Sequence, residues 1–408
     1  MKAEVIAIGS ELTCGARLDT NSQWLSRELE SLGWTVHRHT TVADDRESMI
    51  RLYQEAAARS RLVIITGGLG PTLDDITREC LAAAFDQSLV TDEAALQHIE
   101  SLFKIRNREM PQRNQVQALR PQDAQSIHNA HGTAPGILLH TTDPECTFVA
   151  LPGVPAEMKL MFHEQVVRLL PQSDVVVRRS LIRTFGFGES DVEQQLGDLT
   201  ARGRNPEVGI TASKAVISLS ITARAGSPQE CDLLTGAVRE QICARLGPAV
   251  FGEGDIDLYQ VVADELVRRQ LRVALLEGPT TGGLIGQWLT EHDHWAQQVS
   301  FSQLFPVLQP TAPAVDNAEA GTWQHFLRTK AQELLSKHAA DYVLMSSPSC
   351  TDDNNGVRRQ CGSVLVLGPN LDTDHDVSMT GNLSIFRQRA ARTALNLLRL
   401  HLVQQSAG

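Results

Sequence analysis

The feature that most constrains the fold is a repeated order of strand, loop and helix along the first part of the chain. Residues 3–8 form an apolar run typical of a buried strand, and apolar side chains recur at helical spacing within residues 20–32. The same order returns twice, in the segments 35–38, 46–59, 62–65 and 75–85. Strands that alternate with helices predict a parallel sheet with crossover helices on its faces.

The remaining patterns predict three domains, at residues 1–171, 172–254 and 255–408. The first closes with a strand at 147–151 and a helix that runs to about residue 170. The second is a small α+β module, with strands at 178–187, 208–212 and 215–223 and helices at 189–199 and 228–246. The third returns to the α/β pattern, with a helix at 258–269, strands at 273–276, 342–345 and 363–367, and a closing helix at 385–402. The predicted fold class is therefore α/β.

Composition excludes several classes of protein. The chain of 408 residues has 37 basic and 48 acidic side chains, a formal charge of −11, which does not support a broad nucleic-acid surface. The first apolar run is too short for a signal sequence or a membrane span. Seven scattered cysteines, with no C-x-x-C pair, indicate reduced thiols. We expect a cytoplasmic protein with neither nucleic-acid nor membrane partners.

The most informative segment is TGGLGPTLDDIT, at residues 66–77, which follows a strand and opens a helix. Ligands of open α/β sheets bind at such strand ends, and free amides beside glycines can hold phosphate. Asp74 and Asp75 would repel a bare phosphate, so their presence indicates a divalent cation that bridges them to it. The alternative is structural: Asp74 caps the helix, Asp75 complements its dipole, and the glycines form a turn.

Three further loops are predicted to leave strand ends in the same domain, at residues 9–11, 132–136 and 152–157. Each alone is an ordinary turn signal. Their joint occurrence predicts a shared pocket.

The segments AIGSEL, DTNSQWL, TGGLGPTLDDIT, HGTAPG and LPGVPAEM, in this order and spacing, resemble the CinA family (competence/damage-inducible protein A). The resemblance implies a three-layer first domain with the molybdopterin-cofactor-binding fold. FGFGES, at residues 185–190, is similar to the family's KH-like middle domain, and the third domain is similar to its amidase domain. The implied activity of the first domain is metal-dependent cleavage of ADP-ribose into AMP and ribose 5-phosphate, and the implied assembly is a homodimer.

The motifs and the resemblance together give a predicted site. Asp74 and Asp75 are expected to bind the divalent metal (Mg, Mn or Co), directly or through water, and Glu11 or Asp44 to orient the attacking water or add a metal ligand. The predicted substrate-binding residues are Gly9, Ser10, Asn21, Thr66, Gly67, Gly68, Gly70, Thr72, Thr77, Gly132, Thr133, Pro135, Gly153 and Glu157. The rival hypothesis is a non-catalytic protein whose pocket holds a pterin or a nucleotide.

The third domain departs from the family's nicotinamide mononucleotide amidase, whose signature is A-E-S-C-T-G-G with the serine as nucleophile. The matching residues, 276–283, read LEGPTTGG, which places Pro279 or Gly278 at the nucleophile position. Pro306 stands where the activating lysine is expected, and residues 346–351 replace a Thr-Gly-x-x-Gly-Pro loop. We therefore expect no such amidase activity and a scaffold for packing, dimerisation or ligand sensing. A rewired hydrolase that uses another hydroxyl or thiol is the open alternative.

Overall fold

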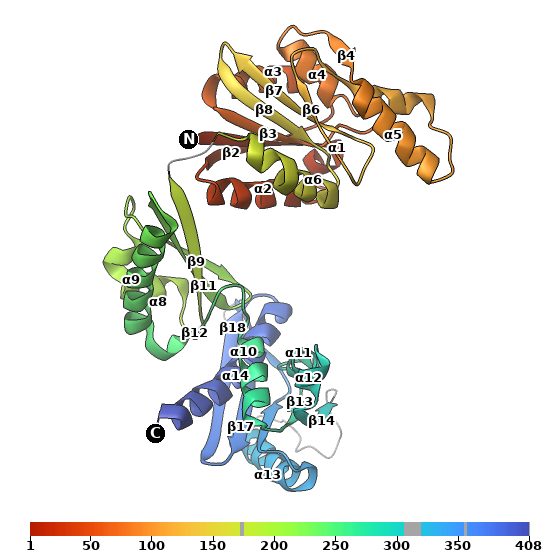
Figure 1. The fold of residues 1–408 in the computed structure, drawn as a ribbon. Coiled ribbons are helices and arrows are strands. Elements are labelled where there is room, and N and C mark those ends of the chain that lie inside the picture. The colour runs from red at the N-terminus through yellow and green to blue at the C-terminus, as the bar shows by residue number, and fades with distance from the viewer. Residues whose placement is uncertain (172–174, 306–319, 355–356, 408) are drawn as a thin grey trace. The chain divides into compact units, whose positions relative to one another are not determined.

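The computed structural model describes residues 1–171, 175–305, 320–354 and 357–407 (Figure 1). Contacts divide the chain into two compact units, one made of Met1–Arg178 with Arg224–Cys231 and the other of Arg179–Ala223 with Asp232–Gly408. The bounds of the three predicted domains stay predictions. None of the described helices combines the length with the apolar composition that a membrane-spanning helix needs.

The first unit contains a six-stranded sheet. Its strands lie in the order β2 (Thr35–Val42), β1 (Lys2–Ile8), β3 (Leu62–Thr66), β8 (Glu145–Leu151), β7 (Gly136–Thr142) and β6 (Gln125–Ile127). Four neighbouring strands, β2, β1, β3 and β8, are parallel, whereas β7 is antiparallel to β8. This arrangement confirms the predicted parallel sheet and adds an antiparallel edge that the sequence analysis did not predict.

Helices cover both faces of this sheet and make three layers (Figure 1). Alternate side chains of β1 and β3 point to opposite faces, as the pleat of a strand requires. One core joins Ile6 and Ile65 to α3 (Arg46–Arg59) and α4 (Thr77–Ala84), and the other joins Ile64 to α2 (Thr20–Ser31) and α6 (Pro155–Met161). The fold class is therefore confirmed as α/β.

Smaller elements complete the first unit. They are α1 (Ser10–Thr13), α5 (Glu93–Ile105), the paired strands β4 (Leu89–Thr91) and β5 (Leu119–Pro121), a 3-10 helix at Gln112–Ala118, and a π-helical turn at Phe162–Val166 that leads into α7 (Val167–Leu169).

A four-stranded sheet follows, in the order β10 (Glu207–Ser213), β11 (Val216–Ala225), β9 (Val176–Thr184) and β12 (Val250–Glu253). Its hydrophobic core includes residues of α8 (Glu189–Leu196) and α9 (Pro228–Leu246), among them Val192 and Ile242. The small α+β module that the sequence predicts is therefore present.

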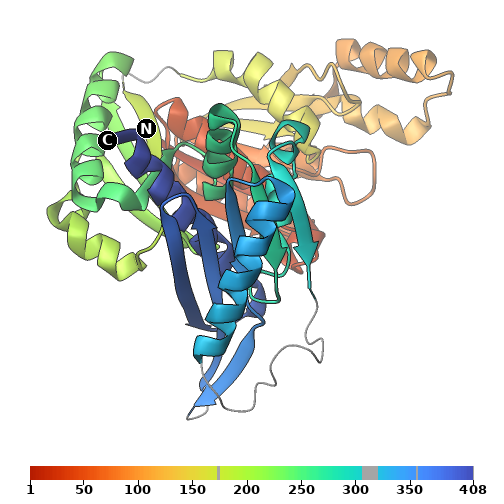
Figure 2. The ribbon, with the colours of Figure 1, turned by 90° about the horizontal axis from the view of Figure 1, so that it is seen from below.

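The last sheet has the order β14 (Val299–Leu304), β13 (Val273–Glu277), β15 (Tyr342–Ser346), β17 (Val357–Gly368) and β16 (Cys350–Asn354), with β18 (Leu371–Thr380) paired to β17. Separate cores form on its two faces. One contains α10 (Leu258–Arg269), α11 (Leu284–Leu289), α12 (Asp293–Ala296) and α14 (Leu383–Ala407). The other contains α13 (Ala320–His338), which crosses the sheet in Figure 2.

A buried ion pair anchors β1 to α3. Glu4 is fully buried, and its carboxylate accepts hydrogen bonds from Arg59 Nε and Nη2, both at 2.8 Å, and from Thr40 Oγ1 at 2.9 Å. Burial opposes the charged form of Glu4, but the hydrogen bonds from Arg59 and Thr40 outweigh it and hold the pKa of Glu4 below its usual value. The charged pair therefore stabilises the folded unit at neutral pH.

Glu4→Gln is expected to lower the free energy of unfolding at pH 7 by about 2 kcal/mol, because it removes a charged acceptor of buried hydrogen bonds. The depressed pKa means that this stabilisation is present above about pH 4.3 and is lost as the pH falls through the lower, folded-state pKa. Urea unfolding of both proteins at a series of pH values tests this, and the difference should shrink in acid. Glu55→Gln, which changes an exposed partner of Arg59, is the control and should have little effect.

Candidate functional site

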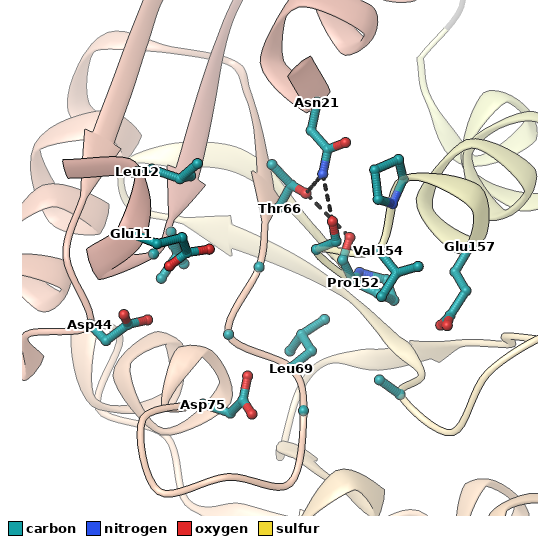
Figure 3. A pocket seen from close by; sticks show the side chains of 18 of the residues that line it. Glu11, Leu12, Asn21, Asp44, Thr66, Leu69, Asp75, Pro152, Val154 and Glu157 are labelled. Carbon is teal, nitrogen blue, oxygen red and sulfur yellow. Dashed lines mark hydrogen bonds between the residues drawn. The ribbon is translucent and has the colours of Figure 1, made fainter. Parts of the chain in front are cut away.

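A cavity of about 490 Å³ lies where β1, β3 and β8 end, at the carboxyl edge of the first sheet (Figure 3). Ligands of open α/β sheets bind at this edge. Loops from distant parts of the sequence meet around the cavity. The predicted site residues that line it are Gly9, Glu11, Asn21, Asp44, Thr66, Gly67, Gly68, Gly70, Asp74, Asp75, Thr133, Gly153 and Glu157.

Five predicted residues do not line the cavity, and most of them contact one that does. Ser10 Oγ donates to Asp44, Thr72 Oγ1 donates to Asp75, and Thr77 Oγ1 donates to the carbonyl of Gly67. Gly132 lies against the carboxylate of Glu157, where a larger residue would collide with it. Pro135 immediately precedes β7. Their roles in substrate binding stay predictions.

The loop that follows β3 needs glycine for conformation as well as space. Gly67 has a φ of 109°, and a Cβ there would lie 2.5 Å from the carbonyl oxygen of Ile8. Gly68 has a φ of 66°, and a Cβ there would collide with the hydroxyl of Thr77. Because both positions combine a left-handed backbone with close packing, no other residue fits them without movement of the loop.

A hydrogen-bonded chain joins three segments at the floor of the cavity (Figure 3). Asn21 Nδ2, on α2, donates to Thr66 Oγ1 and to the carbonyl of Gly153, both at 2.9 Å, and Thr66 Oγ1 donates to the carbonyl of Pro152 at 3.2 Å. Asn21 Oδ1 is buried without a partner in the described part of the chain. These bonds fix the loops against one another.

Asp74 and Asp75 converge on a single hydroxyl. Thr72 Oγ1 donates to Asp75 Oδ2 at 2.5 Å and also contacts Asp74 Oδ1, and Thr72 N donates to Asp75 Oδ2 at 3.0 Å. The hydrogen bond from the Thr72 hydroxyl is the main cause that lowers the pKa of Asp74. The structural alternative for Asp74 is wrong, because α4 begins at Thr77 and its N-cap is Ile76.

Two further carboxylates, those of Glu11 and Asp44, lie on the same side of the cavity as Asp75 (Figure 3). Asp44 Oδ2 accepts from Ser10 N at 2.8 Å and from Ser10 Oγ at 2.9 Å. In the described part of the chain, no hydrogen bond reaches the side chain of Glu11, which is exposed. Asp44 thus holds a loop through its hydrogen bonds to Ser10, whereas the carboxylate of Glu11 has no hydrogen bond within the described residues.

Glu157 lies on the opposite side of the cavity (Figure 3). The buried side chain of Asn129 holds it: Asn129 Nδ2 donates to Glu157 Oε2 at 2.7 Å and to the carbonyl of Ala134 at 3.0 Å. Asn129 Oδ1 accepts from His131 N at 3.1 Å. Glu157 is therefore oriented by a residue that lies outside the cavity and that the sequence analysis did not single out.

The cavity is strongly acidic. Its lining includes the carboxylates of Glu11, Asp19, Asp44, Asp74, Asp75 and Glu157, and Arg17 is the cation among the lining residues. A diphosphate would be repelled from such a pocket unless a cation entered with it. Oxygen ligands suit a hard divalent cation, and Mg²⁺ is commonly held by one or two carboxylates together with substrate phosphates. Among the described residues, no three acidic, histidine or cysteine side chains group to hold a metal by themselves.

Several lining residues were missed by the sequence analysis, including Arg17, Leu18 and Gln117. Arg17 and Leu18 lie between two of the recognised motifs, and that position is a signal that could have identified them. Gln117 comes from the 3-10 helix that precedes β5, and nothing in its local sequence marks it as a site residue.

The segment that resembles the amidase signature is partly buried, most completely at Glu277, Gly278, Thr280 and Thr281. Glu277 ends β13 and accepts from Gly286 N at 2.7 Å and from Ile285 N at 3.1 Å, while burial raises its pKa. A Cβ on Gly278 would lie 2.5 Å from the carbonyl oxygen of Ser347, so a backbone segment fills the space of one possible nucleophile.

Nearby hydroxyls bond to one another. Thr281 Oγ1 lies 2.6 Å from Ser346 Oγ, and Thr280 Oγ1 lies 3.3 Å from Ser347 Oγ, with all four residues buried. Arg387 Nε donates to the carbonyl of Pro279 at 3.1 Å. Pro306, at the expected position of the lysine, lies outside the described residues. This packing leaves the hydroxyl groups engaged within the domain.

Fold and site together define a three-layer α/β protein of the molybdopterin-binding class, joined to a KH domain. The family model described as "Probable molybdopterin binding domain" matches residues 4–172, and "Damage-inducible protein CinA KH domain" matches residues 179–252. The chain belongs to the CinA family, which confirms the resemblance seen in its motifs.

Two relatives illustrate the match. A "Putative competence-damage inducible protein" of Clostridium beijerinckii is 38% identical over 293 residues, which cover 72% of this chain and 71% of that protein. A "CinA-like protein" of Dictyoglomus thermophilum is 39% identical over 286 residues, which cover 70% of this chain and 69% of that protein. The crystal structure of the protein CinA from Thermoplasma acidophilum is 33% identical, covers 41% of this chain and 98% of its own, and has a TM-score of 0.38.

Proposed function

We propose that the first domain is a divalent-metal-dependent hydrolase that cleaves the diphosphate of ADP-ribose or a related nucleotide into AMP and ribose 5-phosphate. The observation that carries this proposal is the coincidence, in one cavity, of a glycine loop suited to phosphate with a cluster of carboxylates. A pocket that only bound an anion would gain little from adjacent carboxylates, because they repel it.

The reaction is the attack of water on one phosphorus of the diphosphate, which breaks the bridging P–O bond and leaves two monophosphates. The loop amides bind the phosphate oxygens, Thr66 fixes the start of the loop through its bond to the carbonyl of Pro152, and Asp74 and Asp75 would hold the cation. When bound, that cation supplies neutralisation of the phosphate charge and polarisation of the phosphoryl group.

Glu11 is the better of the two predicted residues for accepting the proton of the attacking water. Asp44 Oδ2 already accepts two hydrogen bonds from Ser10, whereas the Glu11 carboxylate receives none within the described residues and lines the cavity. Asp44 then acts by fixing the loop that carries Glu11. Glu157, oriented by Asn129, would accept hydroxyl donors of the nucleotide on the far side.

A second candidate function is binding of a pterin or nucleotide without chemistry, which the match to a molybdopterin-binding domain favours. The fold serves both functions, so it cannot choose between them. The acidic cluster favours the hydrolase. A cytoplasmic homodimer, and a scaffold role for the third domain, stay predictions.

The decisive experiment incubates the full chain with ADP-ribose and Mg²⁺, Mn²⁺ or Co²⁺ and resolves the products by chromatography. We expect AMP and ribose 5-phosphate in equal amounts with at least one metal and none with a chelator. Metal-independent binding of ADP-ribose, with no product under any of these conditions, would contradict the hydrolase and support the binding protein.

A further inference from the structure

Two residues at the start of α4 hold four consecutive carbonyl groups of the glycine loop. Thr77 holds the first two: its Oγ1 donates to the carbonyl of Gly67 at 2.9 Å, and its backbone N–H donates to the carbonyl of Gly68 at 3.1 Å. Thr77 is fully buried, so it contacts the loop from within the protein and not from the cavity, whose lining does not include it.

Arg78 holds the next two. Its Nη2 donates to the carbonyl of Leu69 at 2.6 Å, and its Nη1 donates to the carbonyl of Gly70 at 3.2 Å. The side chain of Gln117 also donates to the carbonyl of Leu69, at 3.5 Å. Arg78 is 1% exposed and, like Thr77, does not line the cavity.

The position of Arg78 is costly, and stability alone does not explain it. A buried charge is usually paired with an opposite charge. Within the described residues, the guanidinium forms no salt bridge, and its Nε has no hydrogen-bond partner. Burial lowers the pKa of Arg78 accordingly. The carbonyls of Leu69 and Gly70 accept its hydrogen bonds, and the carboxylates of Glu79 and Asp75 attract it without a direct salt bridge.

Because peptide groups are planar, the contacts that fix the loop carbonyls also fix the direction of the loop N–H groups. In a trans peptide, the N–H of one residue points opposite to the carbonyl of the residue before it. When the carbonyls of Gly67, Gly68 and Leu69 face α4, the N–H groups of Gly68, Leu69 and Gly70 face the other way, where the cavity lies. In the described part of the chain, these three N–H groups have no protein acceptor. Successive unpaired N–H groups form a concave anion site.

We propose that Arg78, together with Thr77, is a positioning residue that turns three loop amides toward the diphosphate from beneath. The identity of the substrate in this proposal rests on the proposed function, whereas the orientation of the loop is independent of it. The guanidinium also places a fixed positive charge behind the loop, where Asp75 and Glu79 attract it. The amides and the buried charge then favour the same ligand, a diphosphate.

Calorimetric titration of the full chain with inorganic pyrophosphate and Mg²⁺ tests the proposal. Arg78→Met, which removes the charge and the donors, should weaken pyrophosphate binding about tenfold or more. Arg78→Lys keeps the charge but cannot reach both carbonyls with a planar fork. Its affinity for pyrophosphate should therefore lie between that of the wild type and that of Arg78→Met. Thr77→Val should weaken binding about fivefold, and Thr77→Ser, which retains the hydroxyl, should restore it.

Arg59→Met is the control, because it removes a half-buried arginine that lies away from the cavity, in the ion pair with Glu4. It should lower stability and leave the affinity for pyrophosphate unchanged. If Arg78→Met fails to fold, the affinities of Arg78→Lys, Thr77→Val and Thr77→Ser for pyrophosphate test the positioning role. Wild-type affinity in Arg78→Met, or in both Arg78→Lys and Thr77→Val, would overturn the proposal, as would a wild-type protein that binds no pyrophosphate.

This experiment separates the two proposals. A protein that binds pyrophosphate in an Arg78-dependent manner but does not hydrolyse ADP-ribose would retain the positioning role and lose the proposed function. A protein that hydrolyses ADP-ribose with unchanged kcat and KM in Arg78→Met would retain the function and lose the positioning role.

Discussion

Replacing Asp74 and Asp75 together by asparagine is expected to lower metal-stimulated ADP-ribose hydrolysis by about 100-fold or more, because it removes two negative charges from the predicted metal site. Both residues lie in the loop before α4, and Asp74 is exposed, so the fold should survive. Product formation over a range of metal concentrations measures the effect, with circular dichroism as the check on folding.

Asp45→Asn is the matched control for that double variant. Asp45 is an exposed aspartate next to Asp44 that caps α3 through a bond from Ser48 N at 2.9 Å, and it does not line the cavity. Asparagine caps helices as well as aspartate, so neither stability nor hydrolysis should change much. Full metal-stimulated activity in the Asp74, Asp75 double variant would contradict the proposal that these two residues bind the metal.

Gly278→Ser is expected to destabilise the third domain by about 3 kcal/mol without producing an amidase. The new Cβ would meet the carbonyl oxygens of Ser347 at 2.5 Å and Ser346 at 2.8 Å, and these are backbone atoms that cannot rotate away. The added hydroxyl would also need a base, which the nearby buried hydroxyls do not supply. Thermal unfolding and ammonia release from nicotinamide mononucleotide are the two measurements.

Two comparisons sharpen this test. Gly236→Ser, in α9, has nothing within 4 Å of the new Cβ and should leave the unfolding temperature close to that of the wild type. Pro279→Ser alone should also remain inactive, because nucleophile and base act as a unit. Ammonia release by the unmodified chain would show that another group, such as Thr280 or Cys350, acts as the nucleophile, and would contradict the scaffold role.

Helices with clear signals at their starts were predictable to the residue. The segments 46–59, 228–246 and 258–269 coincide with α3, α9 and α10. Asp45 and Asp257 cap two of these helices, and Pro228 begins the third. Such signals act within one turn of helix, so a single sequence carries them.

Elements whose conformation depends on distant partners were harder to predict. The strand β7 was missed because its first half is buried and its second half largely exposed, which gives neither a continuous apolar run nor an alternation. The expected strand at 35–38 extends to Val42 as β2, which pairs with β1 along its length despite its polar residues. The helix expected from about residue 75 begins at Thr77, because the side chain of Asp75 binds Thr72.

The sequence predicted site residues that belong to short motifs. It did not predict the residues that hold those motifs in place from outside the cavity. Short motifs, rich in glycines and carboxylates, identified half of the residues that line the cavity. Arg78 and Asn129 act from outside it, through loop carbonyls and Glu157. Their roles follow from folded geometry, since nothing in their local sequence distinguishes them from ordinary polar residues.

The hydrogen bond from Asn21 to the carbonyl of Gly153 has a consequence for folding while the protein is being synthesised. Its partners are 132 positions apart in the sequence, and β3 cannot pair with β8 until the latter has been synthesised. Contacts of such long range form late in folding. A chain emerging from the ribosome therefore carries the glycine loop and both aspartates long before the cavity closes around them. Truncated products that end before Gly153 would be inert toward the nucleotide, however well their first strands and helices had formed.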